Sequence, residues 1–469
     1  MSKSASVRSA GGEVPPSEFP DAQVVGPESR QSEDPTPAPE IPQRFPLGSE
    51  SWAFAARRRH GVQSELIHVV IEFDGHLDQK LLRRAARLLL DAEPVLGCLL
   101  HTENDAPYWE RLDFAQEPDI VRIVSTQQEY DTVLYASVDT STGPPVLVAL
   151  WPREQGDRLL FKTTHDAGDM GAVHTSVARL AEIYTKLSID PRYQPIPNLG
   201  RRDYGLVTEL IPRRAYPRIA WNLVRDISGV LVFPSAHHVP VPGGPDKPWC
   251  YVTRAINPER GRRLSAYAKE RGATLNDLLL AATYRAFAAV GDWNGRTSLR
   301  IPVTIDLRRW YLRPEDKVGL CTLSGLEFPF LGRTLGADLA ETLGRVNKLM
   351  TNRKKHWIGM TTALVVPWTT RRAGYRRVDR RFEMHSHRPR SERGRVGFSN
   401  MGRFEPEGIS FGAQTPASAY GLVMPRAAPA MLMGFTGYRG GLTLSFGTPE
   451  HNRPTVDKLL DAILTELPD

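Results

Sequence analysis

The chain has 469 residues, 41% of them hydrophobic and 24% charged, a composition typical of a soluble globular protein with two domains. No apolar run approaches the roughly 20 residues of a membrane-spanning helix and the N-terminal residues lack the apolar core of a secretory signal, so we expect a cytoplasmic protein without a membrane span. A net charge of +7 and a pI near 9.3 favour an acidic partner or an anionic ligand, and no motif typical of nucleic-acid-binding proteins is present.

Two regions are rich in residues that disfavour regular structure. Residues 1–44 contain mostly Pro, Ser, Glu and Gly without a hydrophobic period, so we expect a disordered tail. Residues 190–248 are proline-rich and are interpreted as a linker, with room for short helices over 201–232. They separate an N-terminal subdomain, 45–189, from a C-terminal subdomain, 249–469. Both contain strand–helix units in similar order, which suggests a pseudo-repeat. One chain could then form the whole active site, so we expect a monomer.

The first half alternates strand and helix patterns. The predicted strands are 65–73, 95–100, 145–151 and 158–163. Asp78 is a candidate N-cap for a helix whose apolar residues recur at helical spacing. A second amphipathic helix follows Asp169, with apolar residues from Val173 to Leu187 on one face.

The second half repeats this alternation. The predicted strands are 249–256, 298–305 and 441–446, and the segment 396–402 precedes the last of them. Helices are predicted to begin at Pro258 and Thr274, and a last helix spans 455–467. An apolar run at 318–323 is expected to be buried.

The segment 162–171 lies where a predicted strand meets a predicted helix, and it contains His165 and Asp169. A polar turn at such a junction can direct an imidazole into a cleft while the flanking elements hold it. An imidazole with a pKa near 6.5 suits general-base catalysis at neutral pH. A histidine followed four residues later by an aspartate is not a specific motif in a chain with 12 histidines. The alternative is that His165 has a structural role.

The strongest charge feature is the segment 371–395, which holds ten arginines and three acidic residues. A solvated surface is the simplest interpretation, and a docking surface for an acidic protein or for nucleotide phosphates is the alternative, ahead of nucleic acid. The pair His385 and His387 inside it lacks metal-ligand spacing. The cysteines are far apart in sequence, which argues against a disulfide framework or a zinc site, so we expect no bound metal; they are Cys98, Cys250 and Cys321.

Several landmarks occur in one order: His165-x-x-x-Asp169, the segment 302–309 that contains Arg308, Val318-Gly319, and Ser399-Asn400-Met401-Gly402. Over about residues 45–467 the chain resembles the condensation-domain and chloramphenicol-acetyltransferase-like superfamily. That superfamily includes condensation domains of nonribosomal peptide synthesis, alcohol acyltransferases and wax ester synthases.

The resemblance implies an α/β (α+β) fold of two chloramphenicol-acetyltransferase-like subdomains in a V-shaped pseudodimer. Mixed sheets would be flanked by helices, with an active-site tunnel between the subdomains. His165 would be the general base, and Asp169 would be mainly structural and paired with Arg308. Ser399 and Asn400 would lie near the oxyanion, and a simple strand-to-loop turn is the alternative role for them.

The sequence departs from the fuller His-His-x-x-x-Asp-Gly pattern at two positions of the motif. Thr164 replaces the first histidine, and Met170 replaces the glycine, with Gly171 one step later. A glycine there permits a tight turn, so the Met170 side chain is expected to reshape the pocket. The late DFGWG motif of plant enzymes is absent, which disfavours that branch.

These features together predict an acyltransferase of secondary metabolism that forms an amide or ester. The acyl donor would be acyl-CoA or a phosphopantetheinyl carrier-protein thioester, acting as substrate with no bound cofactor. The acceptor would be a small-molecule amine or alcohol, and the basic segment 371–395 would dock an acyl or peptidyl carrier protein. The alternatives are a catalytically degenerate module that binds or recruits carrier protein, and another reaction of a carrier-bound intermediate such as cyclisation or dehydration.

Overall fold

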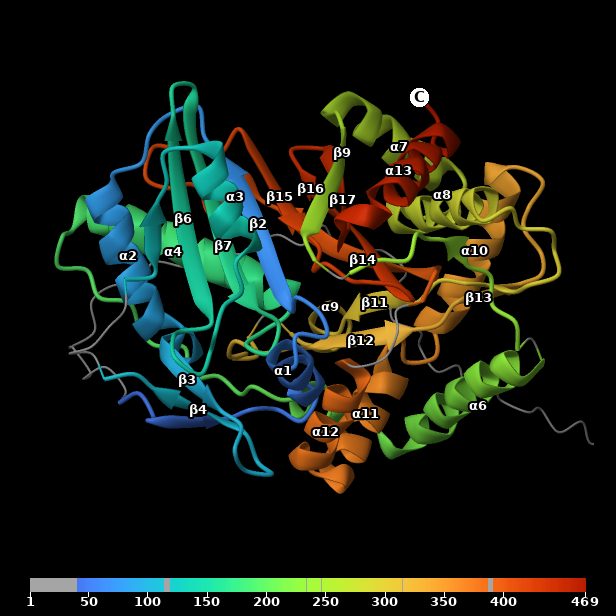
Figure 1. Cartoon of the computed structure of the whole chain (residues 1–469), viewed down its shortest axis with the longest axis horizontal. Helices are drawn as coiled ribbons and strands as arrows, with labels where there is room; N and C mark the ends of the chain where they lie inside the picture. Colours follow the sequence, from blue (N-terminus) through green and yellow to red (C-terminus); the bar gives the residue numbers. More distant parts are fainter. Residues whose placement is uncertain (1–39, 114–118, 233, 246, 314, 387–390) are drawn as a thin grey trace, which may run out of the picture. The chain divides into compact units, whose positions relative to one another are not determined.

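The computed structural model describes residues 40–113, 119–232, 234–245, 247–313, 315–386 and 391–469. Almost all of the tail predicted at 1–44 lies outside these residues, as do residues 387–390 of the arginine-rich segment. Figure 1 shows two large β-sheets flanked by helices, which is the predicted mixed α/β fold. No helix in the described part of the chain is both long enough and apolar enough to span a bilayer.

The first large sheet has the strand order β15–β2–β7–β6–β5. Its strands are β2 (Leu66–Glu72), β5 (Val121–Ile123), β6 (Val146–Arg153), β7 (Gly156–Thr164) and β15 (Ser418–Leu422). Successive side chains point to opposite faces of a strand. Ile71 and Phe161 therefore pack with helices α2 (Gln79–Ala92) and α4 (Met170–Ile189), while Val70 and Leu160 pack with α3 (Gln127–Tyr135). Burial on both faces holds the end of β7 in place.

The second large sheet has the order β12–β11–β14–β16–β17–β9, and β8 pairs with β14. The strands are β8 (Val239–Pro240), β9 (Trp249–Ile256), β11 (Val303–Asp306), β12 (Ser324–Glu327), β14 (Arg393–Phe404), β16 (Ala430–Tyr438) and β17 (Gly441–Pro449). The helices beside it are α7 (Pro258–Glu270), α8 (Leu275–Val290), α10 (Leu339–Lys354) and α13 (Arg453–Glu466).

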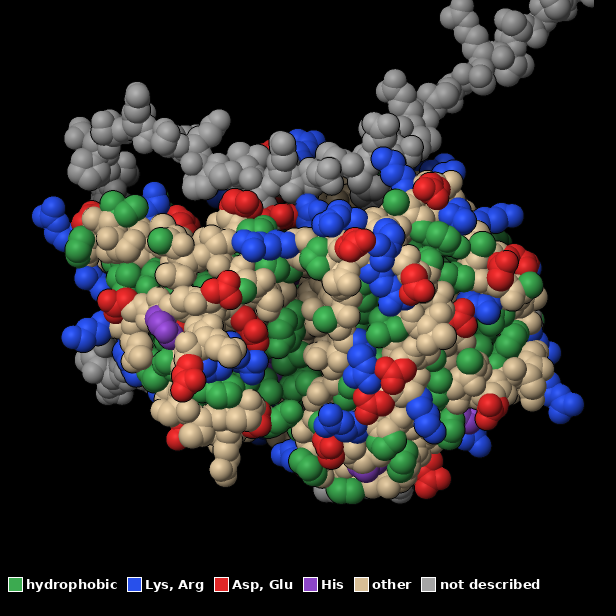
Figure 2. Space-filling model, turned by 90° about the horizontal axis from the view of Figure 1, so that it is seen from above, with side chains coloured by type: hydrophobic (Ala, Val, Ile, Leu, Met, Phe, Trp, Pro, Cys, Tyr) green, Lys and Arg blue, Asp and Glu red, His purple; other side chains and the backbone are tan. Residues whose placement is uncertain are grey.

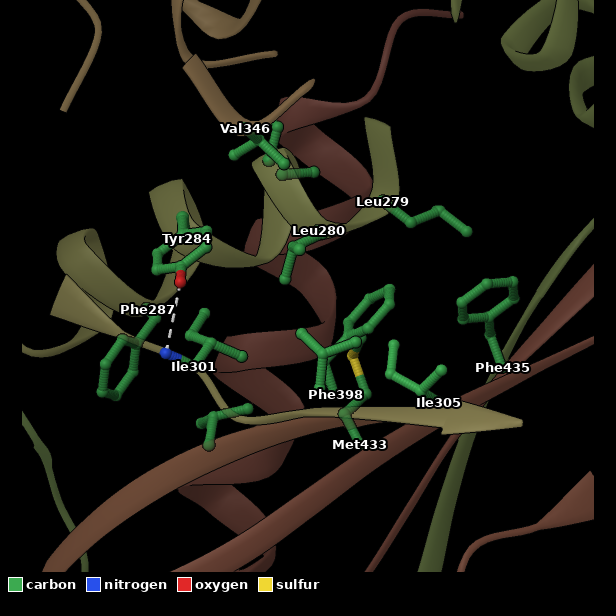
Figure 3. Close-up of a cluster of buried hydrophobic side chains, with 14 of the residues drawn as sticks. Leu279, Leu280, Tyr284, Phe287, Ile301, Ile305, Val346, Phe398, Met433 and Phe435 are labelled. Atoms are coloured by element: carbon green, nitrogen blue, oxygen red, sulfur yellow. Dashed lines mark hydrogen bonds between the residues drawn. The ribbon is translucent and has the colours of Figure 1, made fainter. Parts of the chain in front are cut away.

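Helix α8 is the centre of the second core. Figure 3 shows its Leu279 and Leu280 beside Phe398 and Met433 of the sheet. The buried Tyr284 hydroxyl accepts a hydrogen bond from the Ile301 N–H (3.3 Å) and donates one to the Pro329 carbonyl (2.8 Å). These bonds satisfy the only polar group of a side chain that is otherwise packed in apolar surroundings.

The short elements correct two predictions. The strand predicted at 95–100 begins only at Cys98, because Pro94 opens a 3-10 turn, Pro94–Gly97. The strand predicted at 298–305 is split before Pro302, which has no N–H to donate to a ladder. The short strands are β1 (Arg44–Pro46), β3 (Cys98–His101) and β4 (Tyr108–Arg111) in one sheet, and β10 (Leu299–Arg300) and β13 (Phe330–Gly332) in another.

Two elements of the second half join the first. Strand β15 pairs with β2, and helix α12 (Tyr375–Ser386) packs on α1 (Trp52–Arg59). The Trp52 and Tyr375 rings meet edge to face with centroids 5.9 Å apart. The two predicted subdomains are therefore in contact through β15 and α12, and their boundaries stay a prediction.

The predicted linker contains regular structure. It holds α5 (Gly205–Thr208), a 3-10 turn at Arg213–Ala215, and α6 (Tyr216–Val232), which is longer than the short helices expected there. The remaining helices are α9 (Arg308–Tyr311), α11 (Met360–Ala373) and the 3-10 turns Pro406–Ile409 and Glu450–Asn452.

Candidate active site

His165 directly follows β7, and Asp169 is the N-cap of α4. The His165 N–H donates to the Glu65 carbonyl (2.8 Å), and the Thr322 hydroxyl donates to the His165 carbonyl (3.2 Å). The first bond ties the turn to the residue before β2, and the second ties it to the buried run predicted at 318–323. Both halves of the chain therefore fix the backbone that carries the imidazole.

The carboxylate of Asp169 is fully engaged. It accepts hydrogen bonds from Arg308 Nη1 (2.8 Å), the Ser324 hydroxyl (2.6 Å) and the Leu323 N–H (2.7 Å), and it caps α4 at the Ala172 N–H (3.1 Å). Burial would raise its pKa, but the Arg308 guanidinium and these donors hold the pKa below the usual value. The structure thus brings Asp169 and Arg308 together. The Asp169 carboxylate stabilises the turn and does not face open space.

Gly171 makes room for this ion pair. A β-carbon on Gly171 would lie 2.8 Å from Arg308 Nη1, closer than any side chain tolerates. Arg308 also donates to the Cys321 carbonyl (2.7 Å), so it has little freedom to withdraw. The glycine at position 171 is therefore needed so that the α4 backbone and the Arg308 guanidinium can lie close together.

Met170 occupies the first position of α4 with ordinary helical backbone, so the turn does not need a glycine there. Its side chain lies against Gly421 of β15, where a β-carbon would collide with Met170 Cε. Gly421 of the crossing strand β15 has no side chain. This leaves room for the Met170 side chain, which stands where the motif has a glycine.

The His165 imidazole is nearly enclosed, with 7% of the residue exposed. The ring of Phe54 from α1 is stacked on it, with centroids 3.8 Å apart and planes 9° from parallel. Nδ1 is buried without a hydrogen-bond partner among the described residues. Burial lowers the pKa of His165, against the opposing influence of Glu65 and Asp169, so the ring is neutral at pH 7 and keeps a basic nitrogen.

A buried carboxylate that the sequence interpretation missed lies beside this ring. Glu65 is fully buried and is paired with Arg57 Nε (2.5 Å) and Arg426 Nη2 (3.8 Å). Burial would raise the pKa of Glu65, but the two guanidinium groups lower it below the usual value. The available signal was a glutamate opening an otherwise apolar strand; the partners come from α1 and from the segment after β15.

The remaining predicted site residues are Thr164, Ser399 and Asn400. Thr164 is buried at the end of β7, and its hydroxyl has no partner among the described residues. Ser399 Oγ accepts from the Thr304 hydroxyl (2.9 Å), and the Asn400 amide donates to Asn276 Oδ1 (3.2 Å). None of the hydrogen bonds recorded for Ser399 or Asn400 reaches His165, so their oxyanion role stays a prediction.

One small hollow lies beside the turn. A cavity of about 10 Å³ lies beside Asp166 and Ala167, too small for a substrate. A shallow depression of about 550 Å³ lies elsewhere, along the end of α13 near Arg260 and Tyr267. Figure 2 shows hydrophobic side chains gathered along a central hollow of one face, with charges of both signs on either side.

The described residues include no metal-binding cluster and no paired cysteines. In the described part of the chain, no three His, Cys, Asp or Glu side chains are grouped to hold a metal ion. The three cysteines are separate and buried, and burial raises the pKa of each thiol to about 12; they are Cys98, Cys250 and Cys321. His165 remains the group at the turn that is suited to proton transfer.

No family model and no curated protein sequence matches the chain, but solved structures do. The first condensation domain of the calcium-dependent antibiotic synthetase aligns with 15% identity and a TM-score of 0.64, covering 90% of this chain and 96% of that one. Polyketide synthase associated protein 5 from Mycobacterium tuberculosis aligns with 15% identity and a TM-score of 0.63, covering 91% and 98%.

Trichothecene 15-O-acetyltransferase from Fusarium sporotrichioides is similar over a comparable length. It aligns with 12% identity and a TM-score of 0.70, covering 91% of this chain and 95% of that one. Each of these alignments covers at least 90% of this chain. The chain therefore shares the fold of these condensation-domain and acetyltransferase structures, the fold that the sequence resemblance implied.

Proposed function

We propose that the protein is an acyltransferase that moves an acyl group from a CoA or carrier-protein thioester to an amine or hydroxyl acceptor. The observation that carries this proposal is the His165 imidazole, which is held at the β7–α4 turn and is neutral because burial lowers its pKa. The fold shared with condensation domains and an acetyltransferase supports the same class of reaction.

In the proposed reaction, His165 accepts the proton of the acceptor O–H or N–H as the acceptor atom attacks the thioester carbon. The new C–O or C–N bond forms while the carbonyl electrons move to oxygen. The tetrahedral intermediate then expels the thiolate by C–S cleavage, and the imidazolium returns the proton to sulfur. A positioned base of this kind contributes about 10²- to 10⁴-fold to the rate.

The arginine-rich segment is the proposed docking surface for an acidic carrier protein. Its described arginines are all exposed: Arg371, Arg372, Arg376, Arg377, Arg380, Arg381, Arg393 and Arg395. Most of them lie on α11 and α12, and α12 packs on the helix that carries Phe54. Docking there would place a carrier next to the element that covers His165.

The test offers acyl-CoA and acyl-carrier-protein thioesters with pooled amine and alcohol acceptors, and measures thiol release and product mass. We expect acceptor-dependent turnover that is lost in His165→Ala and retained in His237→Ala. His237 is a matched control because it is equally buried, with its ring bound to the Phe287 carbonyl in the second core. Equal turnover by wild type and His165→Ala would reject His165 as the base.

A second candidate function is a non-catalytic module that binds carrier protein. The stacking of Phe54 on the imidazole favours it, because the ring has little open surface for a substrate. This candidate predicts carrier binding that is unchanged in His165→Ala and no thiol release with any donor. The proposed enzyme predicts turnover with at least one donor class, so the same assay separates the two functions.

A further inference from the structure

Helix α6 (Tyr216–Val232) buries polar side chains and exposes most of its apolar ones, although Ile219 packs in the second core. On the inner face, the Asn222 amide donates to the His356 carbonyl (2.6 Å), and Asp226 is paired with Arg353 (2.6 Å). On the outer face, the side chains Trp221, Val224, Ile227 and Leu231 are between 51% and 74% exposed. A surface helix of a soluble protein has the opposite arrangement.

The outer residues form one continuous stripe. Trp221, Val224, Ile227 and Leu231 are spaced by three, three and four positions, so they stand above one another along the helix. The neighbouring helix α11 is in contact with α6 and adds exposed Trp368. We call the four α6 side chains the outer stripe. Figure 1 shows α6 beyond the ends of both large sheets, with α11 as its neighbour.

The N-terminal end of α6 is strongly basic. Arg213, Arg214 and Arg218 are exposed, and none of them forms an ion pair with a described residue. Tyr216 lies among them and Trp221 follows Arg218 by three positions, and such amphipathic aromatic side chains favour the boundary between apolar and aqueous phases. The helix thus combines an apolar face with cations at its edge.

From this combination we infer that α6 docks the protein on a membrane surface rich in anionic phospholipids, lying in the plane of the headgroups. The outer stripe would enter the headgroup–acyl boundary, while Arg213, Arg214 and Arg218 would contact phosphate groups. Charge complementarity favours this partner over a second copy of the chain, because the net charge of +7 opposes association of two basic surfaces. The inference does not depend on the proposed acyl transfer.

The test is cosedimentation of the full chain with phosphatidylglycerol vesicles and with phosphatidylcholine vesicles. We expect binding to the anionic vesicles that weakens with added salt. The variant Trp221→Ser/Leu231→Ser should lose about tenfold or more in partitioning, since each apolar side chain leaves the acyl region. Arg213→Gln/Arg214→Gln should lose about 25-fold, because each arginine near an anionic surface contributes about fivefold.

Ile189→Ser is the matched control, because Ile189 is 79% exposed at the end of α4, outside the outer stripe, and its loss should leave binding unchanged. Insertion depth is read from Val224→Cys carrying a polarity-sensitive dye, since the three native cysteines are buried. We expect a blue shift with phosphatidylglycerol vesicles. Absence of binding to anionic vesicles, binding insensitive to the α6 variants, or dimerisation abolished by Trp221→Ser would each overturn the inference.

Discussion

Phe54 is the residue that most directly controls the surroundings of His165. Because its ring excludes water from one face of the imidazole, Phe54→Ala should raise the pKa of His165 toward its usual value. The measurement is an NMR pH titration of the His165 ring. Phe382→Ala is the matched control, since both phenyl rings lie over the Arg57 guanidinium but the stacking contact with His165 is made by Phe54. An unchanged pKa in Phe54→Ala would contradict this account.

Asp169 and Arg308 form the ion pair on which the turn depends. Asp169→Ala should lower the free energy of unfolding by about 3 kcal/mol, because the mostly buried Arg308 loses its close carboxylate partner (2.8 Å) and keeps only the longer contact with Asp306 (3.4 Å) among its recorded ion pairs. The double variant Asp169→Ala/Arg308→Met should lose less than the sum of the single changes. Urea unfolding measures all three. Glu259→Gln, which breaks an exposed pair with Arg263, should cost about 0.5 kcal/mol or less. Additive losses at Asp169 and Arg308 would show that the pair is not coupled.

At the scale of elements, the crossing strand β15 and helix α4 fit each other through Gly421 and Met170. Gly421→Val should destabilise the fold by about 1–3 kcal/mol, because the added side chain must displace Met170 Cε. Met170→Ala in the same chain should recover much of that loss. Thermal unfolding compares the single and double variants. If Met170→Ala gives no recovery, the two side chains do not share the space.

Sequence patterns predicted the elements whose periodicity is strong and local. The helix after Asp78 begins where its carboxylate caps the Lys80 and Leu81 N–H groups, and β7 and α4 flank His165 as expected. Helix α1 escaped prediction because Trp52–Arg59 is only 8 residues long, ends in three arginines and buries mainly alanines. The contact between Phe54 and His165 joins residues far apart in the chain, so no local pattern encodes it. The ion pair between Glu65 and Arg426 also joins residues far apart in the chain, so no local pattern encodes it.

At the scale of the molecule, the basic segment on α11 and α12 predicts docking that depends on ionic strength. Charge-reversal of Arg376 and Arg380 should raise the KM for a carrier-protein thioester while leaving the KM for a small CoA thioester nearly unchanged. Added salt should have the same selective effect, since exposed charges are screened. Arg262→Glu/Arg271→Glu, on α7 and just after it, is the control. Equal effects on both donors would mean that the segment does not hold the carrier.

The fold places two chemically different surfaces on neighbouring helices. The arginine-rich helix α12 packs on α1, whose Phe54 is stacked on His165, and α6 contacts α11 and exposes most of its apolar side chains. A carrier and a membrane would therefore approach from adjacent directions. Variants distinguish carrier docking from membrane docking. Changes in the outer stripe should alter vesicle binding, and changes in α12 should alter the KM for the carrier.

The central claim is that a neutral His165 removes the acceptor proton. The most direct test is the pH dependence of kcat/KM for thiol release, compared between wild type and His165→Ala. Because burial lowers the pKa of His165, the activity of wild type should be constant at neutral pH and fall only below about pH 6.5, where the imidazole becomes protonated. In His165→Ala this acid limb should vanish together with about 10²- to 10⁴-fold of the rate. An acid limb of unchanged position and amplitude in His165→Ala would contradict the claim.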